Sequence, residues 1–268
     1  MEQTTYLFTF GDSYTQTDFD PSGTKPSLSN PMGNPKLGTC TSSGGINWVG
    51  YLVTSNPGIL SFNLAAGGAT IDKAMIHSDA RDLVSQINLF GEHYCPRDGG
   101  KAVPWTSENA VFGIWIGINE YEPTVYSNDL YFNDSVGLSF EGKTPPIQSL
   151  MNRYAAQMER LYDEGARRFL FLNVPPTSRS PLIGLQGSQV ENRHAEWVKA
   201  FNDALGQMVR AVLYDTWSFM TAILDDPEKY GFENSEDGAE QIWWNDYHPS
   251  SRYHRLQVED MGDVINMI

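Results

Sequence analysis

The chain is poor in basic residues: 18 Lys and Arg stand against 33 Asp and Glu among 268 residues, and the formal net charge is −15. Contacts with phosphate groups need an excess of Lys and Arg, so this balance argues against nucleic acid and anionic membrane surfaces as partners. The sequence also has no apolar run that approaches the ~18 residues of a membrane-spanning helix. We therefore expect a protein that acts on a neutral small molecule.

The N-terminus lacks the marks of a secretory leader, since Met1-Glu2-Gln3 has neither a basic start nor an apolar stretch after it. That absence fits a cytosolic protein and equally a mature secreted one. Cysteine is scarce too, and Cys40 and Cys95 allow either one disulfide or two separate thiols. The low lysine content and the glycosylation sequon Asn133-Asp134-Ser135 favour secretion, so we predict an extracellular protein in which the two cysteines pair.

The histidines do not indicate a metal site. Four of them have no partner at metal-ligand spacing on a recognisable element, namely His77, His93, His194 and His254. The sequence therefore predicts neither a metal ion nor another cofactor.

Apolar segments alternate between strand-like and helix-like patterns along the whole chain. Strands are expected over 5–10, 59–64, 111–116, 168–174 and 213–217, and helices over 46–54, 80–90, about 150–165, about 191–212 and about 251–267. The stretches 15–45, 91–107, 121–146 and 225–240 read as loops. This alternation predicts one α/β domain over residues 1–268, a three-layer sandwich with about five parallel strands in a flavodoxin-like order 2-1-3-4-5. We expect it to be a monomer.

The stretch Phe8-Thr9-Phe10-Gly11-Asp12-Ser13-Tyr14 takes an apolar strand directly into a serine. In open α/β sheets the carboxyl ends of the strands bind ligands, at the point where the strand order reverses. In the order 2-1-3-4-5 the loops after the first three strands converge there, and these loops contain Ser13, Gly68 and Asn119. Gly-Asp-Ser alone is also an ordinary turn sequence, and Asn119 follows the turn-prone Gly117.

With these residues in place, the chain resembles the GDSL, or SGNH, family of serine hydrolases. The matching blocks, in chain order, are Gly11-Asp12-Ser13, Asn63 with Gly68, Gly117-Ile118-Asn119 and His248-Pro249. Two positions depart from the family pattern: Glu120 stands where the family usually has Asp, and Asn245 stands where the family has the acid of its last block. The stretch from Trp243 to Pro249 and the long first loop further resemble fungal esterases that deacetylate xylo-oligosaccharides.

The resemblance implies an acyl-enzyme mechanism. Ser13 would be the nucleophile, because a serine hydroxyl attacks only when a base takes its proton, and His248 would be that base. The N–H groups of Ser13 and Gly68 and the side-chain amide of Asn119 would form the oxyanion hole. Asp12 is interpreted as a structural residue that orients the loop.

The partner of His248 stays open at this point, because Asn245 can accept a hydrogen bond but carries no charge. Asp246 could take the role after a local shift, a backbone carbonyl could serve a Ser13–His248 dyad, or the site could be impaired. We favour an active enzyme in which Asn245 or a carbonyl orients His248 and Asp246 turns away, because neighbouring residues of an extended segment point to opposite sides.

The predicted function is that of a serine esterase that removes O-acetyl groups from carbohydrates, with acetylated xylo-oligosaccharides as the expected substrates. Indole faces suit sugar rings, and four tryptophans lie near the motif blocks, Trp48, Trp115, Trp243 and Trp244, although most tryptophans belong to protein cores. The alternatives are a lipase-like or lysophospholipase-like esterase, and an inactive carbohydrate-binding protein on the same fold.

Overall fold

A parallel sheet forms the centre of the computed structural model, which describes residues 4–95, 103–121, 145–233 and 241–262. Its strands are β1 (Thr5–Gly11), β2 (Ile59–Asn63), β3 (Ala110–Trp115), β4 (Phe169–Leu172) and β5 (Val212–Tyr214). They run in the order β2-β1-β3-β4-β5, and every neighbouring pair is parallel. The predicted fold class and strand order are therefore confirmed. The sequon at 133–135 lies outside the described residues.

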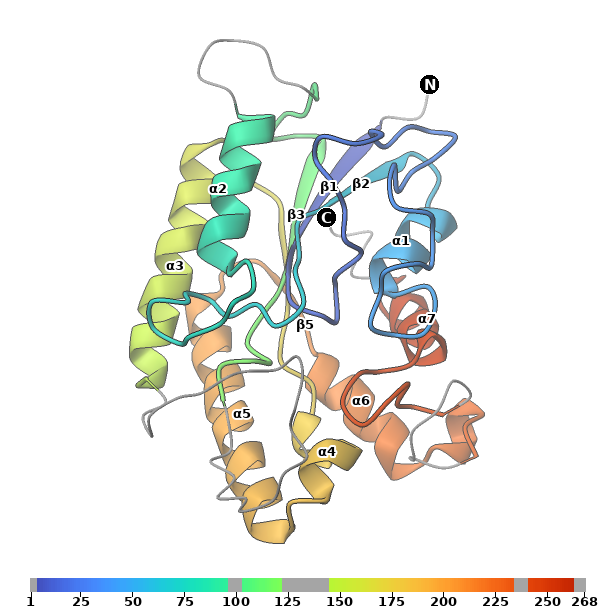
Figure 1. The fold of residues 1–268 in the computed structure, drawn as a ribbon, viewed down its shortest axis with the longest axis vertical. Coiled ribbons are helices and arrows are strands. Elements are labelled where there is room, and N and C mark those ends of the chain that lie inside the picture. Colours follow the sequence, from blue (N-terminus) through green and yellow to red (C-terminus); the bar gives the residue numbers. More distant parts are fainter. Residues whose placement is uncertain (1–3, 96–102, 122–144, 234–240, 263–268) are drawn as a thin grey trace.

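Helices cover both faces of this sheet. They are α1 (Trp48–Ser55), α2 (Leu83–Tyr94), α3 (Ile147–Asp163), α4 (Pro181–Gly184), α5 (Ser188–Met208), α6 (Thr216–Asp225) and α7 (Ser251–Asp260). In Figure 1, α2, α3 and α5 lie to the left of the strands, whereas α1 and α7 pack together on the right. None of the helices within the described ranges is long and apolar enough to cross a membrane.

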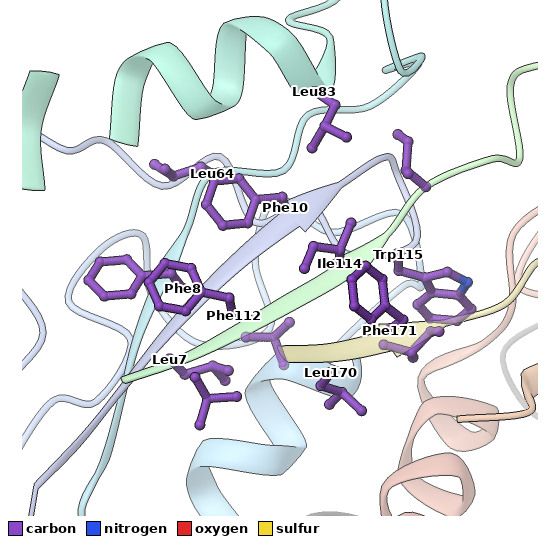
Figure 2. Close-up of a cluster of buried hydrophobic side chains, with 14 of the residues drawn as sticks. Leu7, Phe8, Phe10, Leu64, Leu83, Phe112, Ile114, Trp115, Leu170 and Phe171 are labelled. Carbon is purple, nitrogen blue, oxygen red and sulfur yellow. The ribbon is translucent and has the colours of Figure 1, made fainter. Parts of the chain in front are cut away.

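The neighbouring strands β1 and β3 are apolar on both sides, because helices cover both faces of the sheet. Figure 2 shows Phe8 and Phe10 on the side of the sheet that faces α2, and Leu7 and Leu170 on the opposite side. Phe8 packs edge-on against Phe90 of α2, with ring centroids 5.0 Å apart. This packing holds the carboxyl end of β1, where Ser13 follows, at a fixed place.

Three predicted elements have different boundaries in the structure, and polar caps explain the first two differences. The strand expected over 213–217 stops at Tyr214, because the side chain of Asp215 accepts the N–H of Ser218 and begins α6. The helix expected over 80–90 begins at Leu83, after the cap Asp82, and continues to Tyr94, into the stretch that was expected to be a loop from Gly91. The helix expected to reach 212 ends at Met208. The short α4, α6 and the 3₁₀ helices Thr177–Arg179 and Glu228–Tyr230 were not predicted.

The predicted disulfide is also wrong, since Cys40 and Cys95 form no disulfide bond in the structure as described. Cys40 is exposed in the segment 15–45, which has no helix or strand. Beside it, a Cβ on Gly38 would lie 3.1 Å from the side chain of Ile46, just before α1. Cys95 follows α2, which covers the opposite face of the sheet. The sheet therefore separates the two thiols.

Candidate active site

Ser13 follows β1 at the carboxyl edge of the sheet, and Gly11 sets the path of the chain into it. Gly11 has φ +149°, and a Cβ at this position would lie 2.1 Å from the carbonyl oxygen of Trp115. The side chain of Gln86 in α2 accepts the Gly11 N–H at 2.9 Å and donates to its carbonyl at 2.8 Å. A residue with a side chain would not fit at position 11, between β3 and the Gln86 amide. Gln86 supports the serine loop through these contacts, and sequence reasoning missed it.

The turn that presents Ser13 is built around Asp12. The Asp12 carboxylate accepts the N–H of Tyr14 at 3.0 Å, and its carbonyl accepts the N–H groups of Thr15 and Gln16. Asp12 is fully buried, whereas Ser13 is half-buried. These contacts fit the predicted structural role of Asp12, and they leave Ser13 on the partly exposed side of the turn.

His248 lies within hydrogen-bonding distance of Ser13. Its Nε2 is 2.9 Å from the Ser13 Oγ, although the two residues are 235 positions apart in the chain. Burial lowers the pKa of His248 from 6.5 to about 4. The imidazole is therefore neutral near neutral pH and can accept the serine proton.

Asn245, and not Asp246, contacts the His248 ring. The Oδ1 of Asn245 lies 3.1 Å from His248 Nδ1 and also accepts the backbone N–H groups of Tyr247 at 2.9 Å and His248 at 2.8 Å. Those two backbone groups can only donate, so the amide cannot rotate to present its NH₂ group instead. Nδ1 consequently holds the proton and Nε2 is left free to act as the base.

Asp246 is not brought to the site. Its side chain is exposed, and its backbone carbonyl accepts the N–H of Leu182 in α4. The bond to α4 holds this part of the loop, so that Asn245 faces the imidazole while Asp246 faces solvent.

Two tyrosines that the sequence did not single out hold the histidine loop against the serine loop. The hydroxyl of Tyr14 donates to the Tyr247 carbonyl at 2.5 Å, and the hydroxyl of Tyr247 donates to the Ile118 carbonyl at 3.3 Å. The Tyr14 ring also packs against the imidazole of His248, with centroids 5.6 Å apart. The loops after β1 and β3 are thus tied to the loop before α7.

The loops that carry the predicted oxyanion-hole donors Gly68 and Asn119 lie next to the loop of Ser13. A Cβ on Gly67 would lie 3.8 Å from the Cβ of Ser13, which places the loop after β2 next to the serine. Asn119 donates one amide hydrogen to the Ala69 carbonyl at 2.9 Å and keeps a second hydrogen. Within the described residues, the N–H groups of Ser13 and Gly68 have no acceptor. All three groups can therefore donate to a substrate oxygen, and their catalytic role stays a prediction.

Asp12 and Glu120 form a pair of buried acids beneath this site. Burial, together with the charge of Asp12, raises the pKa of Glu120 from 4.5 to about 8. Burial likewise raises the pKa of Asp12 from 3.8 to about 7, against the opposing effect of the Tyr14 N–H. Glu120 accepts the N–H of Ile71 at 2.5 Å through one oxygen. A proton on these acids keeps negative charge away from the place where the oxyanion forms.

We expect Glu120→Gln to weaken the pH dependence of stability. In the unfolded chain Glu120 ionises near its ordinary pKa of 4.5, whereas the folded protein retains the proton to about pH 8. The wild-type free energy of unfolding should therefore fall as pH rises through this window. Glutamine resembles the protonated acid and cannot ionise. The free energy of unfolding of the variant should therefore exceed that of wild type by an amount that grows by up to about 1.4 kcal/mol for each pH unit in this window.

Urea unfolding at pH 5, 6, 7 and 8 tests this expectation. The matched control is Glu159→Gln, which changes an exposed glutamate of α3. Parallel pH profiles for wild type and Glu120→Gln would show that Glu120 is already ionised in the folded protein.

No metal site is evident: the described residues contain no group of three or more His, Cys, Asp or Glu side chains that could hold an ion. His194 and His254 are instead buried in separate surroundings. His194 contacts the Thr177 hydroxyl at 3.1 Å, and His254 packs edge-on against Trp115. Both histidines therefore belong to the packing of the fold.

The chain is similar to known proteins over nearly its whole length. The model of the family described as GDSL-like Lipase/Acylhydrolase matches residues 7–261. A protein described as an acetylesterase from Thermothelomyces thermophilus is 37% identical over 282 residues, which cover 97% of this chain and 88% of that protein. An acetylesterase from Hypocrea jecorina is 28% identical over 180 residues, which cover 63% of this chain and 47% of that protein.

A solved structure shares the fold. An alpha/beta hydrolase enzyme from the metagenome of Lake Arreo, Spain, matches with a TM-score of 0.55 at 13% sequence identity, covering 98% of this chain and 95% of the other. At this identity the similarity concerns the arrangement of the sheet and helices alone.

Proposed function

We propose, from the premise that this chain belongs to the GDSL-like lipase/acylhydrolase family, that it removes O-acetyl groups from carbohydrates. It is a carboxylic ester hydrolase by its family and by the 37% identical acetylesterase. The observation that supports the proposal most is the line of contacts from Asn245 through His248 to Ser13, with distances of 3.1 and 2.9 Å.

The acylation step follows from this geometry. His248 Nε2 takes the Ser13 proton as Oγ forms a bond to the acetyl carbonyl carbon, and the carbonyl oxygen becomes an oxyanion. The N–H groups of Ser13 and Gly68 and the amide of Asn119 would donate to it. The imidazolium then gives the proton to the sugar oxygen, the ester C–O bond breaks, and the acetyl group remains on Ser13.

Deacylation repeats the sequence with water. His248 takes a proton from a water molecule that attacks the acetyl-Ser13 carbonyl, and the second oxyanion forms at the same donors. When it collapses, the proton passes from His248 to Ser13 Oγ and acetic acid leaves, which ionises to acetate in solution. The acceptor Oδ1 of Asn245 holds Nδ1–H in place throughout, but it adds no charge to stabilise the imidazolium.

A neutral sugar ester suits the charge of the chain. The net charge of −15 disfavours anionic lipid surfaces and nucleic acid, and a neutral carbohydrate carries no charge to be repelled. Two relatives described as acetylesterases support a short acyl group. Within the proposal, acetylated xylo-oligosaccharides are the substrates, the protein acts outside the cell, and it works as a monomer.

An acyl-chain series tests the proposal. We expect kcat/KM for an aryl acetate to exceed that for the corresponding octanoate by about tenfold or more, since a site adapted to an acetyl group would accommodate the six additional methylenes of octanoate poorly. Acetylated xylo-oligosaccharide should be deacetylated, with acetate release as the measurement. The control is the Ser13→Ala protein in every assay.

Each alternative function gives a different outcome. A preference for octanoate would assign the chain to lipid substrates. Sugar binding without release of acetate from any ester would indicate an inactive carbohydrate-binding protein.

A further inference from the structure

Trp244 differs from the other tryptophans near the site because its indole is open to solvent. Its exposed fraction is 40%, whereas those of Trp48, Trp115 and Trp243 are all 0%. The three buried tryptophans are core residues, so Trp244 is the one of these four whose indole can contact a sugar. We infer that the Trp244 indole is the platform on which the sugar ring of the substrate stacks, an inference that rests on the proposed esterase function.

Trp244 projects on the same side of its hairpin as His248. Trp243 and Pro249 form an antiparallel bridge, and the Trp244 N–H donates to the His248 carbonyl at 2.8 Å. Trp244 and His248 are therefore opposite each other in the ladder, and such pairs project from the same face. Trp243 points to the other face, where it is buried. The indole and the imidazole consequently project from the same face of the hairpin.

Gly44 supports one face of the indole. A Cβ on Gly44 would lie 2.2, 2.3 and 2.5 Å from Cδ2, Cε3 and Cε2 of Trp244. Cδ2 is bonded to ring atoms on all sides, so a point this close to all three atoms must lie over the ring face. Gly44 has φ +69° and no side chain, which allows this approach. With that face covered, the opposite face is the one that can stack.

Because Trp244 and His248 project from the same face, the indole lies on the side of the site that takes the alcohol part of the ester. His248 must give its proton to the leaving oxygen, so the sugar has to lie on the histidine side of the reacting carbon. The acetyl methyl points away from that oxygen, and the carbonyl oxygen faces the donors from Ser13, Gly68 and Asn119. A planar apolar ring on the His248 face of the hairpin matches the C–H face of a neutral pyranose, and no charged group is needed for the contact.

The test compares two acetyl esters that differ in the alcohol. Acetylated xylo-oligosaccharide offers a ring to Trp244, and vinyl acetate does not. For Trp244→Ala we expect KM for the oligosaccharide to rise at least tenfold, and its kcat/KM to fall at least tenfold more than that for vinyl acetate. Trp244→Phe keeps a planar ring and should recover most of the lost kcat/KM.

Tyr162→Ala is the matched control, because Tyr162 is an exposed aromatic residue at the end of α3, on the opposite face of the sheet. It should leave the ratio between the two substrates as in wild type. Equal losses on both esters with Trp244→Ala, or an unchanged KM for the oligosaccharide, would overturn the stacking role. A wild-type protein that fails to deacetylate the oligosaccharide would instead overturn the proposed function itself.

Discussion

Ser13→Ala is expected to lower kcat for an acetyl ester by about 10⁵-fold or more without unfolding the protein. The substitution removes the only atom that could carry the acetyl group in the proposed mechanism, and a methyl group fits where Oγ stood. Because Ser13 is half-buried and its Oγ contacts His248, the loss should not extend to the core. Steady-state hydrolysis of an aryl acetate and circular dichroism measure the two parts of the expectation.

The double variant provides a sharper test of the Ser13–His248 pair. Residues that act as a unit are strongly non-additive, so His248→Ala alone should cost about as much as Ser13→Ala, and the double variant little more. The matched control is Ser29→Ala, which removes an exposed hydroxyl of the segment 15–45. Activity of Ser13→Ala within tenfold of wild type, with an unchanged circular dichroism spectrum, would exclude Ser13 as the nucleophile.

The features that the sequence predicted correctly depend on local pattern. Apolar strands that alternate with helical stripes indicated the parallel sheet, and the reversal of strand order placed the loops with Ser13, Gly68 and Asn119 at one edge. The chain brings His248 to that edge from 235 residues away. No local sequence pattern predicts that two residues so far apart in the chain come together. The pairing of Ser13 with His248 was predicted from the resemblance to a family.

The features that sequence reasoning missed depend on three-dimensional neighbours. The clamp of Gln86 on Gly11 and the hydroxyl of Tyr14 on the Tyr247 carbonyl join segments 75 and 233 residues apart. The disulfide between Cys40 and Cys95 was predicted because secreted proteins often pair their cysteines. It does not form, because the sheet lies between the two residues. The exposure of Trp244, unlike that of Trp243 beside it, follows from the strand pairing and not from composition.

Asn245→Asp is expected to raise kcat. The carboxylate would accept the same hydrogen bonds from Tyr247 and His248, and its charge would stabilise the imidazolium that forms in the transition state. The opposite change, from acid to amide, lowers kcat by about 10⁴-fold in a serine protease, and we take this as the upper bound of the gain in kcat. The smallest gain that we expect is about tenfold. Asn245→Ala should lower kcat/KM by about 10- to 100-fold, because it leaves the ring and two backbone N–H groups without their acceptor.

The pH dependence of the same variant separates a charge effect from a positioning effect. Wild-type His248 has a pKa lowered to about 4 by burial, so kcat/KM should fall only below about pH 4. A carboxylate at position 245 favours the imidazolium and raises this pKa towards 6.5, which moves the acidic limb of the profile to higher pH. Asp246→Ala is the control and should change neither kcat nor the limb, since its side chain is exposed. A thousandfold loss in Asp246→Ala beside a nearly silent Asn245→Ala would identify Asp246 as the catalytic acid and reject the role of Asn245.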